Sequence, residues 1–112
     1  MNLSPSTEMQ EFLRQVTKFI NKEVIPLQQE TEGLGWAEIA ESLEPLRQEN
    51  RERGWWLPQI EKEYGGMGLS VIEHGLLCAE LGRTPFGMYL FNAQAPDAGN
   101  MEILIQHGSE AQ

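Results

Sequence analysis

Cysteine, basic residues and long apolar runs are all scarce in this sequence, and each shortage excludes a class of protein. Cys78 is the one cysteine in 112 residues, so no disulfide can form within the chain and a reducing compartment is expected. Residues 1–11 carry neither the basic start and apolar core of a signal peptide nor the arginines of a mitochondrial presequence. No apolar run approaches the ~20 residues that a membrane helix needs. We therefore predict a cytoplasmic protein with no membrane span.

Basic residues number 8 against 17 acidic ones, which gives a formal net charge of −9. A chain this acidic repels phosphate backbones, and no stretch gathers enough lysine and arginine to reverse the charge locally. Nucleic acid is therefore not expected as a partner.

Alternation of apolar and polar residues, the pattern of a half-buried strand, is also missing, and helical spacing replaces it. The first helix is predicted over residues 5–24, where apolar residues recur every three or four positions and Thr7 to Gln10 form a capping box. Pro26 ends or bends this helix, and residues 27–35 are predicted to form a loop.

A second helical region covers residues 36–53 and contains Pro45. Two interpretations are open, because a short helix could end near Ser42 or the main helix could begin there with Pro45 in its first turn. Gly54 stands where a left-handed C-terminal cap is expected.

A third helix is predicted from Ser70, which forms a capping box with Glu73, as far as Leu81, with Gly82 as its stop. The inner face is expected to hold Ile72, Leu76, Ala79 and either Leu77 or Leu81.

Residues 86–107 carry only Asp97 and Glu102 as charged side chains, and Pro96 splits them into two helical pieces that should be buried on several sides. Ser109 to Gln112 form a further capping box with no helix after it, so the natural polypeptide is expected to continue. Together the segments predict an all-α fold, an antiparallel bundle of about five helices in a single domain over residues 1–112.

The stretch between the second and third helices combines glycines with aromatic side chains. Gly65, Gly66 and Gly68 could cradle a phosphate or form a structural turn. We favour the turn, with Gly65 or Gly66 at positive φ, because no strand precedes the cluster and acidic residues flank it. Trp55 and Trp56 are adjacent and cannot both face one core, so one of them is expected to meet a second domain or subunit.

No catalytic or metal-binding group of residues can be assembled from the sequence. His74 and His107 stand far apart, without a cysteine or histidine at ligand spacing, and Cys78 is predicted to be a small core residue. We therefore assign no catalytic, cofactor-binding or metal-binding residue to this chain.

Leu90, Phe91, Gln94 and Ala98 fall on one side of the chain if a helix persists through them. Apolar, small and amide side chains of this kind could line a cavity for an apolar ligand. Periodicity alone favours ordinary core packing, and both interpretations stay open at this point.

Two motifs make the chain similar to the N-terminal domain of acyl-CoA dehydrogenases. The first reads Gly-Trp-Trp-Leu-Pro over residues 54–58 and Glu-Tyr-Gly-Gly-Met-Gly-Leu-Ser over residues 63–70. The second is Met-Glu-Ile-Leu-Ile-Gln-His-Gly-Ser-Glu-Ala-Gln over residues 101–112, and Cys-Ala-Glu-Leu-Gly-Arg over residues 78–83 supports both. The similarity spans nearly the whole chain.

The resemblance implies an all-helical domain that precedes a β-barrel-like middle domain and a C-terminal four-helix domain in a homo-oligomeric enzyme. Such enzymes take two hydrogens from an acyl-CoA substrate, the α-proton going to a glutamate and the β-hydride to FAD. The glutamate and most flavin contacts are implied to lie in the later domains, so this chain alone is expected to bind no FAD and to be inactive. Its implied contribution is one wall of the acyl pocket, at Leu90, Phe91, Gln94 and Ala98.

Two classes of function therefore compete. The chain is either the N-terminal part of a flavin-dependent acyl-CoA dehydrogenase, an oxidoreductase of fatty-acid metabolism, or a free-standing helical module that binds proteins or an acyl ligand. The first predicts a reading frame that continues beyond Gln112, and the second predicts a stop codon there.

Overall fold

The computed structural model describes residues 4–112, and every regular element within them is helical. The predicted all-α class is confirmed, and so is the number of about five helices when the first two, which run on through a π-helical segment, are counted as one rod. In chain order the elements are α1 (Thr7–Phe19), the π segment (Ile20–Val24), α2 (Ile25–Glu30), α3 (Trp36–Glu52), a 3₁₀ turn (Lys62–Tyr64), α4 (Val71–Leu81), α5 (Gly87–Leu90) and α6 (Asp97–His107).

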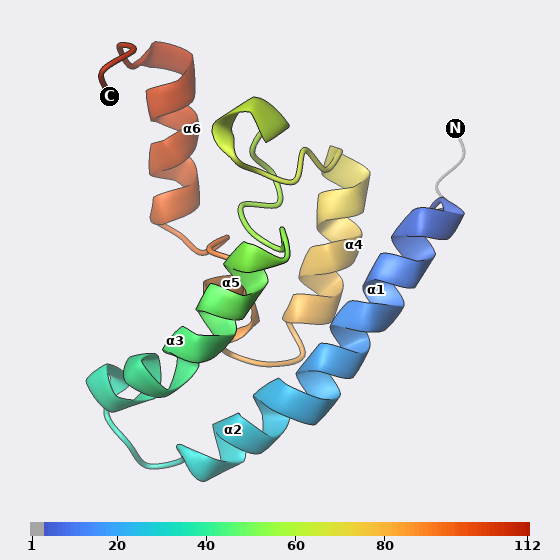
Figure 1. Ribbon diagram of the computed structural model, residues 1–112, viewed down its shortest axis with the longest axis vertical. Helices are drawn as coiled ribbons and strands as arrows, with labels where there is room; N and C mark the ends of the chain where they lie inside the picture. Colours follow the sequence, from blue (N-terminus) through green and yellow to red (C-terminus); the bar gives the residue numbers. More distant parts are fainter. Residues whose placement is uncertain (1–3) are drawn as a thin grey trace.

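The helices form a thin slab in which α1 and α4 lie side by side, while α3 and α6 run in the opposite direction (Figure 1). The molecule measures 40 × 37 × 21 Å, so its short dimension holds two layers of helices about 10 Å in diameter. The single turn of α5 packs against both α3 and α4.

The core lies where α1, the π segment, α3, α4 and α5 meet, and α6 contributes no buried residue to it. The two helical pieces predicted over residues 86–107 are confirmed as α5 and α6, but the prediction that both are buried on several sides was wrong for α6. The buried cluster consists of Val16, Phe19, Ile20, Val24, Leu43, Leu77, Leu81, Phe86, Leu90 and Phe91.

The N-cap of α1 lies one residue before the predicted capping box. Ser6, not Thr7, is the N-cap, and its hydroxyl accepts a hydrogen bond of 3.1 Å from the Met9 N–H. A serine hydroxyl three positions before an N–H satisfies one of the donors that a helix start leaves unpaired.

The predicted loop after Pro26 was wrong over its first residues, because the helix runs on to Glu30. The chain passes the proline by widening its turn just before it, and the Ile25 N–H donates to the carbonyl of Ile20 in the π segment. Pro26 then stands in the first turn of α2, where a missing N–H costs least.

Both interpretations of the second helical region were wrong, since α3 runs unbroken from Trp36 to Glu52 with Pro45 inside it. Pro45 lies on the solvent side of the helix, where water can replace the hydrogen bond that proline cannot make. The left-handed cap after α3 is confirmed, with Gly54 at a φ of 85°.

The capping box at the start of α4 is confirmed, since the Ser70 and Glu73 side chains each bond the backbone of the other. Its predicted inner face was right only in part. Leu77 and Leu81 are buried, but Ile72 and Ala79 face solvent. Because α4 is apolar around most of its surface, spacing along the sequence did not show which side packs on α1.

Candidate functional site

Leu90 and Phe91, two of the four predicted wall residues, end α5 and are fully buried. Their carbonyls are bonded from outside the helix. Asn50 Nδ2 donates to the Leu90 carbonyl at 3.0 Å, and the Leu57 N–H donates to the Phe91 carbonyl at 2.9 Å. These bonds satisfy acceptors that the end of a short helix would otherwise leave open, and they fix α5 to α3 and to the loop after it.

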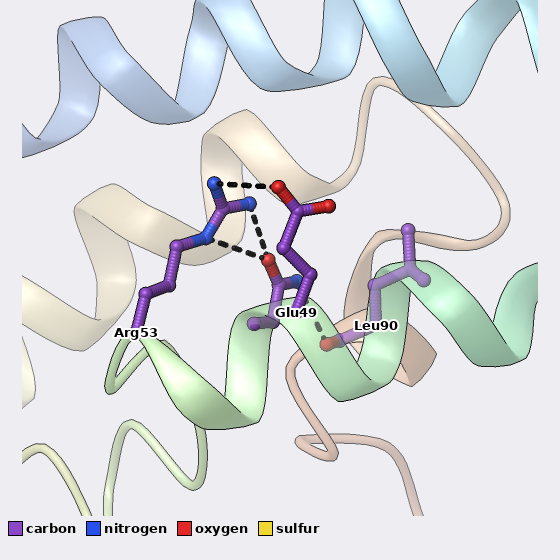
Figure 2. Close-up of polar contacts among 4 residues, drawn as sticks. Glu49, Arg53 and Leu90 are labelled. Carbon is purple, nitrogen blue, oxygen red and sulfur yellow. Dashed lines mark hydrogen bonds and ion pairs between the residues drawn. The ribbon is translucent and has the colours of Figure 1, made fainter.

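Asn50 itself is completely buried, and its side chain bonds both Arg53 and Leu90, which are labelled in Figure 2. Its amide reaches Leu90 on one side, while its Oδ1 accepts a hydrogen bond of 3.1 Å from Arg53 Nε on the other. Arg53 also faces Glu49, with 3.8 Å between Nη1 and Oε1. A buried amide with both ends bonded is a positioning group, because replacing it leaves a carbonyl unpaired inside the protein.

The Arg53 guanidinium lies 3.8 Å from the ring centre of Trp55 and 4.8 Å from that of Phe19. Its burial lowers the pKa of Arg53, while the nearby Glu49 and Glu23 carboxylates act in the opposite direction. Both rings, Arg53 and Glu23 border a surface hollow of about 460 Å³ beside α1.

The two adjacent tryptophans do face different sides, as the sequence predicted. Trp55 points into the core, where it stacks on Phe91 with ring centres 5.8 Å apart. Trp56 lies outside the core, with the guanidinium groups of Arg47 and Arg51 at 5.0 and 5.8 Å from its ring centre. A contact between either tryptophan and a second domain stays a prediction.

Gln94 and Ala98, the other two predicted wall residues, belong to the turn that opens α6. No helix persists from Leu90 to Ala98, because the chain leaves α5 at Phe91 and enters α6 at Asp97. The Ala98 N–H donates to the Gln94 carbonyl at 3.1 Å, so these two are brought together. Leu90 and Phe91 therefore lie in the core, whereas Gln94 and Ala98 are half-buried at the start of α6.

The amide of Gln94 is only partly satisfied in this turn. Its Nε2 donates to Asp97 Oδ2 at 3.4 Å, whereas its Oε1 is buried without a hydrogen-bond partner. The amide Nε2 and Oε1 of Gln59 are likewise buried without a hydrogen-bond partner. Gln59 borders a hollow of about 300 Å³ together with Ile105 and Gln106 of α6. Buried side-chain polar atoms usually have a hydrogen-bond partner, which ordered water or a neighbouring group can supply.

The glycine loop is a structural turn, because all three glycine N–H groups donate to carbonyls of the same loop. Gly66 bonds Glu61 at 3.1 Å, and Gly68 bonds Ile60 at 2.8 Å. Gly65 has a φ of 89°, which confirms the predicted positive value, while Gly66 is required because a Cβ there would stand 2.1 Å from the Ile60 oxygen. With its N–H groups bonded and acidic residues beside it, this loop does not fit the pyrophosphate of a flavin.

His74 and Cys78 form a contact that the sequence analysis missed, with 3.5 Å between Nε2 and Sγ. Burial raises the pKa of the Cys78 thiol, which keeps it protonated and a poor nucleophile. Among residues 4–112, no group of three or more histidine, cysteine, aspartate or glutamate side chains could hold a metal ion. In the same residues, no helix has both the length and the apolarity to cross a membrane.

The positioning role of Asn50 was also missed, although the sequence holds a signal for it. Asn50 shares a helical face with Leu43 and Leu46. An amide among apolar side chains needs a bonded partner inside the protein, but spacing cannot say that the partner is Leu90, forty positions away.

Comparison of the sequence and the fold with known proteins shows the family to which this chain belongs. Residues 6–112 match the sequence model of the family described as Acyl-CoA dehydrogenase, N-terminal domain. The chain is 34% identical to "Acyl-CoA dehydrogenase family member 10" of Mus musculus and 33% identical to family member 11 of the same species, over 98% and 92% of its own length. It spans only 11% and 14% of those two proteins.

A solved structure of a proposed acyl-CoA dehydrogenase from Mycobacterium abscessus shares the fold, with a TM-score of 0.82 and 31% sequence identity. The likeness covers 97% of this chain and 30% of that longer one. The shared fold and the sequence match over residues 6–112 agree, and the chain belongs to the acyl-CoA dehydrogenase N-terminal domain family.

Proposed function

We propose that this chain is the N-terminal domain of a flavin-dependent acyl-CoA dehydrogenase, in which it forms one wall of the acyl pocket and packs against the rest of the enzyme. The observation that carries the proposal is the fold shared over 97% of this chain with only 30% of a longer protein of the family. The α,β-dehydrogenation of an acyl-CoA, the bound FAD, a role in fatty-acid metabolism, homo-oligomeric assembly and a cytoplasmic location belong to the same proposal.

The exposed surface of α6 supports packing against further domains. Ile103 and Leu104 are 60% and 46% exposed, and Tyr64 on the glycine loop is 53% exposed beside them. Leu104 and Tyr64 border a common hollow of about 290 Å³. Apolar side chains that gather in one place on a surface mark an interaction site.

Gln94 and Ala98 are the wall residues best placed to meet an acyl chain, because they are half-buried at the border of α6. Leu90 and Phe91 lie behind them in the core and would support the wall rather than contact the substrate. The unpartnered Gln94 Oε1 suits a site that is completed by another group. We propose no catalytic step for this chain, since its glycine loop does not fit the pyrophosphate of a flavin.

Ala98→Phe in the full-length enzyme tests the pocket wall. The larger side chain should shorten the cavity and raise the ratio of kcat/KM for short over long acyl-CoA substrates by about tenfold. Ala79→Phe, at an exposed position of α4, is the matched control and should leave the ratio unchanged. An unaltered chain-length profile in Ala98→Phe would remove this residue from the wall.

A visible spectrum tests whether FAD binding requires the other domains of the enzyme. The full-length enzyme should carry the flavin absorbance band and lose it when acyl-CoA is added without an electron acceptor. The 112-residue chain alone should be colourless and inactive, because a flavin needs a shaped site with convergent polar groups. A stoichiometric flavin band in the short chain would contradict the proposal.

A further inference from the structure

The chain changes direction at Asn92, between α5 and the segment that opens α6. Asn92 has a φ of 52°, in the left-handed region. Its N–H donates to the Tyr89 carbonyl at 3.2 Å, and the Ala93 N–H donates to the Met88 carbonyl at 2.9 Å. These two bonds around a left-handed residue form a Schellman motif, in which asparagine can take the place of the usual glycine. Asn92 therefore sets the direction in which the chain leaves α5 toward Gln94.

Arg47 of α3 holds this turn from outside. Its Nη2 donates to Asn92 Oδ1 at 3.3 Å. Its guanidinium also lies 4.0 Å from the ring centre of Tyr89 on α5 and 5.0 Å from that of Trp56, which follows α3. The Arg47 Nε atom is buried, so the side chain is inserted between these segments and does not extend into solvent. One arginine thus joins three segments of the chain at the point where α5 ends.

A second residue with a strained backbone supports the same turn. Leu57 and Asn92 are the two non-glycine residues at positive φ among residues 4–112. The Leu57 N–H donates at 2.9 Å to the carbonyl of Phe91, directly before Asn92. A bulky residue keeps such a conformation only where the surrounding contacts determine it, and such places often serve a function. The turn is therefore fixed by the loop backbone on one side and by Arg47 on the other.

The contacts of Arg47 require an arginine. A planar guanidinium can lie against aromatic rings and still donate a hydrogen bond at its edge, whereas the ammonium of lysine is a point charge. Arg51, one turn further along α3, provides a comparison. Its guanidinium lies 5.8 Å from the Trp56 ring centre, but in the part of the chain that the structure describes it neither bonds Asn92 nor lies over Tyr89.

We propose that Arg47 is a positioning residue for the acyl-pocket wall. By fixing the turn at Asn92, it sets where Gln94 and Ala98 stand against the acyl chain. The Ala98 N–H donates to the Gln94 carbonyl, so a displacement of Gln94 is passed on to Ala98. Small displacements in a pocket change the discrimination between substrates that differ by a few methylene groups. The inference rests on the proposed wall, and it adds a residue that acts through Asn92 and not by contact with the substrate.

Amide exchange in the 112-residue chain tests the hold of Arg47 on the turn. Arg47→Lys keeps the charge and the helix propensity but loses the bond to Asn92. It should speed exchange of the Ala93 and Ala98 N–H groups about fivefold, as the loss of one hydrogen bond predicts, while the amides of α4 keep their rates. Arg51→Lys is the matched control and should leave every rate unchanged. Unchanged rates at Ala93 and Ala98 in Arg47→Lys would overturn the inference, as would equal acceleration throughout the chain.

Asn92→Gly removes the same contact from its other end. Glycine accepts the positive φ and lacks Oδ1, so the turn persists without the bond to Arg47. This variant should speed exchange of Ala93 and Ala98 as Arg47→Lys does. The double variant should show less than the sum of the two effects in free energy, because both substitutions remove one shared contact. Fully additive effects would show that the two side chains act separately and would overturn the inference.

Steady-state kinetics of the full-length enzyme then test the effect on the wall. Arg47→Lys should lower the discrimination between long and short acyl-CoA substrates, measured as the ratio of their kcat/KM values, about threefold. The change should appear in KM with kcat nearly constant, because a wall that binds the acyl chain acts equally on the ground state and the transition state. A merely structural role would lower activity toward both substrates alike and leave the ratio unchanged. Arg51→Lys should also leave it unchanged.

Ala98→Phe, measured beside Arg47→Lys, separates this inference from the proposed wall. A shifted ratio in Ala98→Phe with an unaltered ratio in Arg47→Lys would overturn the positioning role and leave the wall intact. An unaltered ratio in both variants would remove the wall, and the role of Arg47 in specificity with it.

Discussion

α5 and α6 follow one another in the chain and are both poor in charge, yet they differ completely in burial. α5 has four residues, of which Gly87 and Leu90 are buried, whereas none of the eleven residues of α6 is buried. An apolar composition predicts that a helix packs against another surface. It does not predict whether that surface belongs to the same chain.

The difference has a local cause in how each helix is fixed. α5 approaches α4 so closely that a Cβ at Gly87 would stand 2.2 Å from the Leu81 oxygen, and its last carbonyls are bonded by Asn50 and Leu57. α6 borders the glycine loop through the hollow that holds the unpartnered amide of Gln59. α5 is therefore part of the core, whereas α6 exposes apolar side chains to solvent.

Matched leucine truncations should produce the largest contrast between the two helices. Leu90→Ala removes a side chain that is fully buried in the core, so the free energy of unfolding should fall by about 2–5 kcal/mol. Leu104→Ala removes one that is 46% exposed on α6, and the loss should stay within about 0.5 kcal/mol. Denaturant unfolding of both variants measures the contrast, and equal losses would show that α6 is part of the cooperative core.

Asn50→Ala should separate the anchoring of α5 from its apolar packing. The substitution leaves the Leu90 carbonyl unpaired in the core and opens a small cavity, so we expect a loss of about 2–3 kcal/mol. Gln48→Ala, an exposed position of the same helix, is the control and should change stability little. Amide exchange should report faster opening of residues 87–91, and an unchanged rate there would mean that packing alone holds α5.

Gly66→Val tests whether the glycine loop beside α6 requires close backbone packing, as α5 does at Gly87. A side chain at Gly66 would collide with the backbone of Ile60, so we expect a loss of roughly 1–3 kcal/mol in the free energy of unfolding. The thermal midpoint measures it. A midpoint equal to that of the unchanged chain would count against a structural role for this turn.

Local features of the fold could be predicted because a few neighbouring residues determine them. The capping box at Ser70, the left-handed Gly54 and the positive φ of Gly65 all depend on hydrogen bonds or sterics within about five residues. The same reasoning misplaced the first cap by one residue, since Ser6 and Thr7 offer the same hydroxyl.

Features that depend on distant contacts could not be predicted in this way. The inward side of α4 is chosen by α1, and the bond that ties Asn50 to Leu90 joins residues forty positions apart. Helix propensity alone predicted a helix boundary near Pro45, whereas α3 continues through this residue because its inner face packs on the core. The acyl-pocket wall stays a prediction, and its four residues do not share one helical face, because the chain leaves α5 at Phe91 and enters α6 at Asp97.

Two matched glycine substitutions should give the smallest effects and the finest test of how α6 differs from the packed helices. Gly75 in α4 and Gly99 in α6 are both exposed, and a Cβ at either would meet no atom within 4 Å. Replacing glycine by alanine in a helix interior should gain about 0.5–1 kcal/mol through reduced freedom of the unfolded chain. For Gly75→Ala this gain should appear in the global free energy of unfolding, because α4 carries core residues and unfolds with them. For Gly99→Ala it should appear instead as slower amide exchange within α6, with the global midpoint nearly unchanged, because a helix without buried residues can open before the core does. A global gain from Gly99→Ala as large as that from Gly75→Ala would show that α6 unfolds together with the core and would remove the distinction.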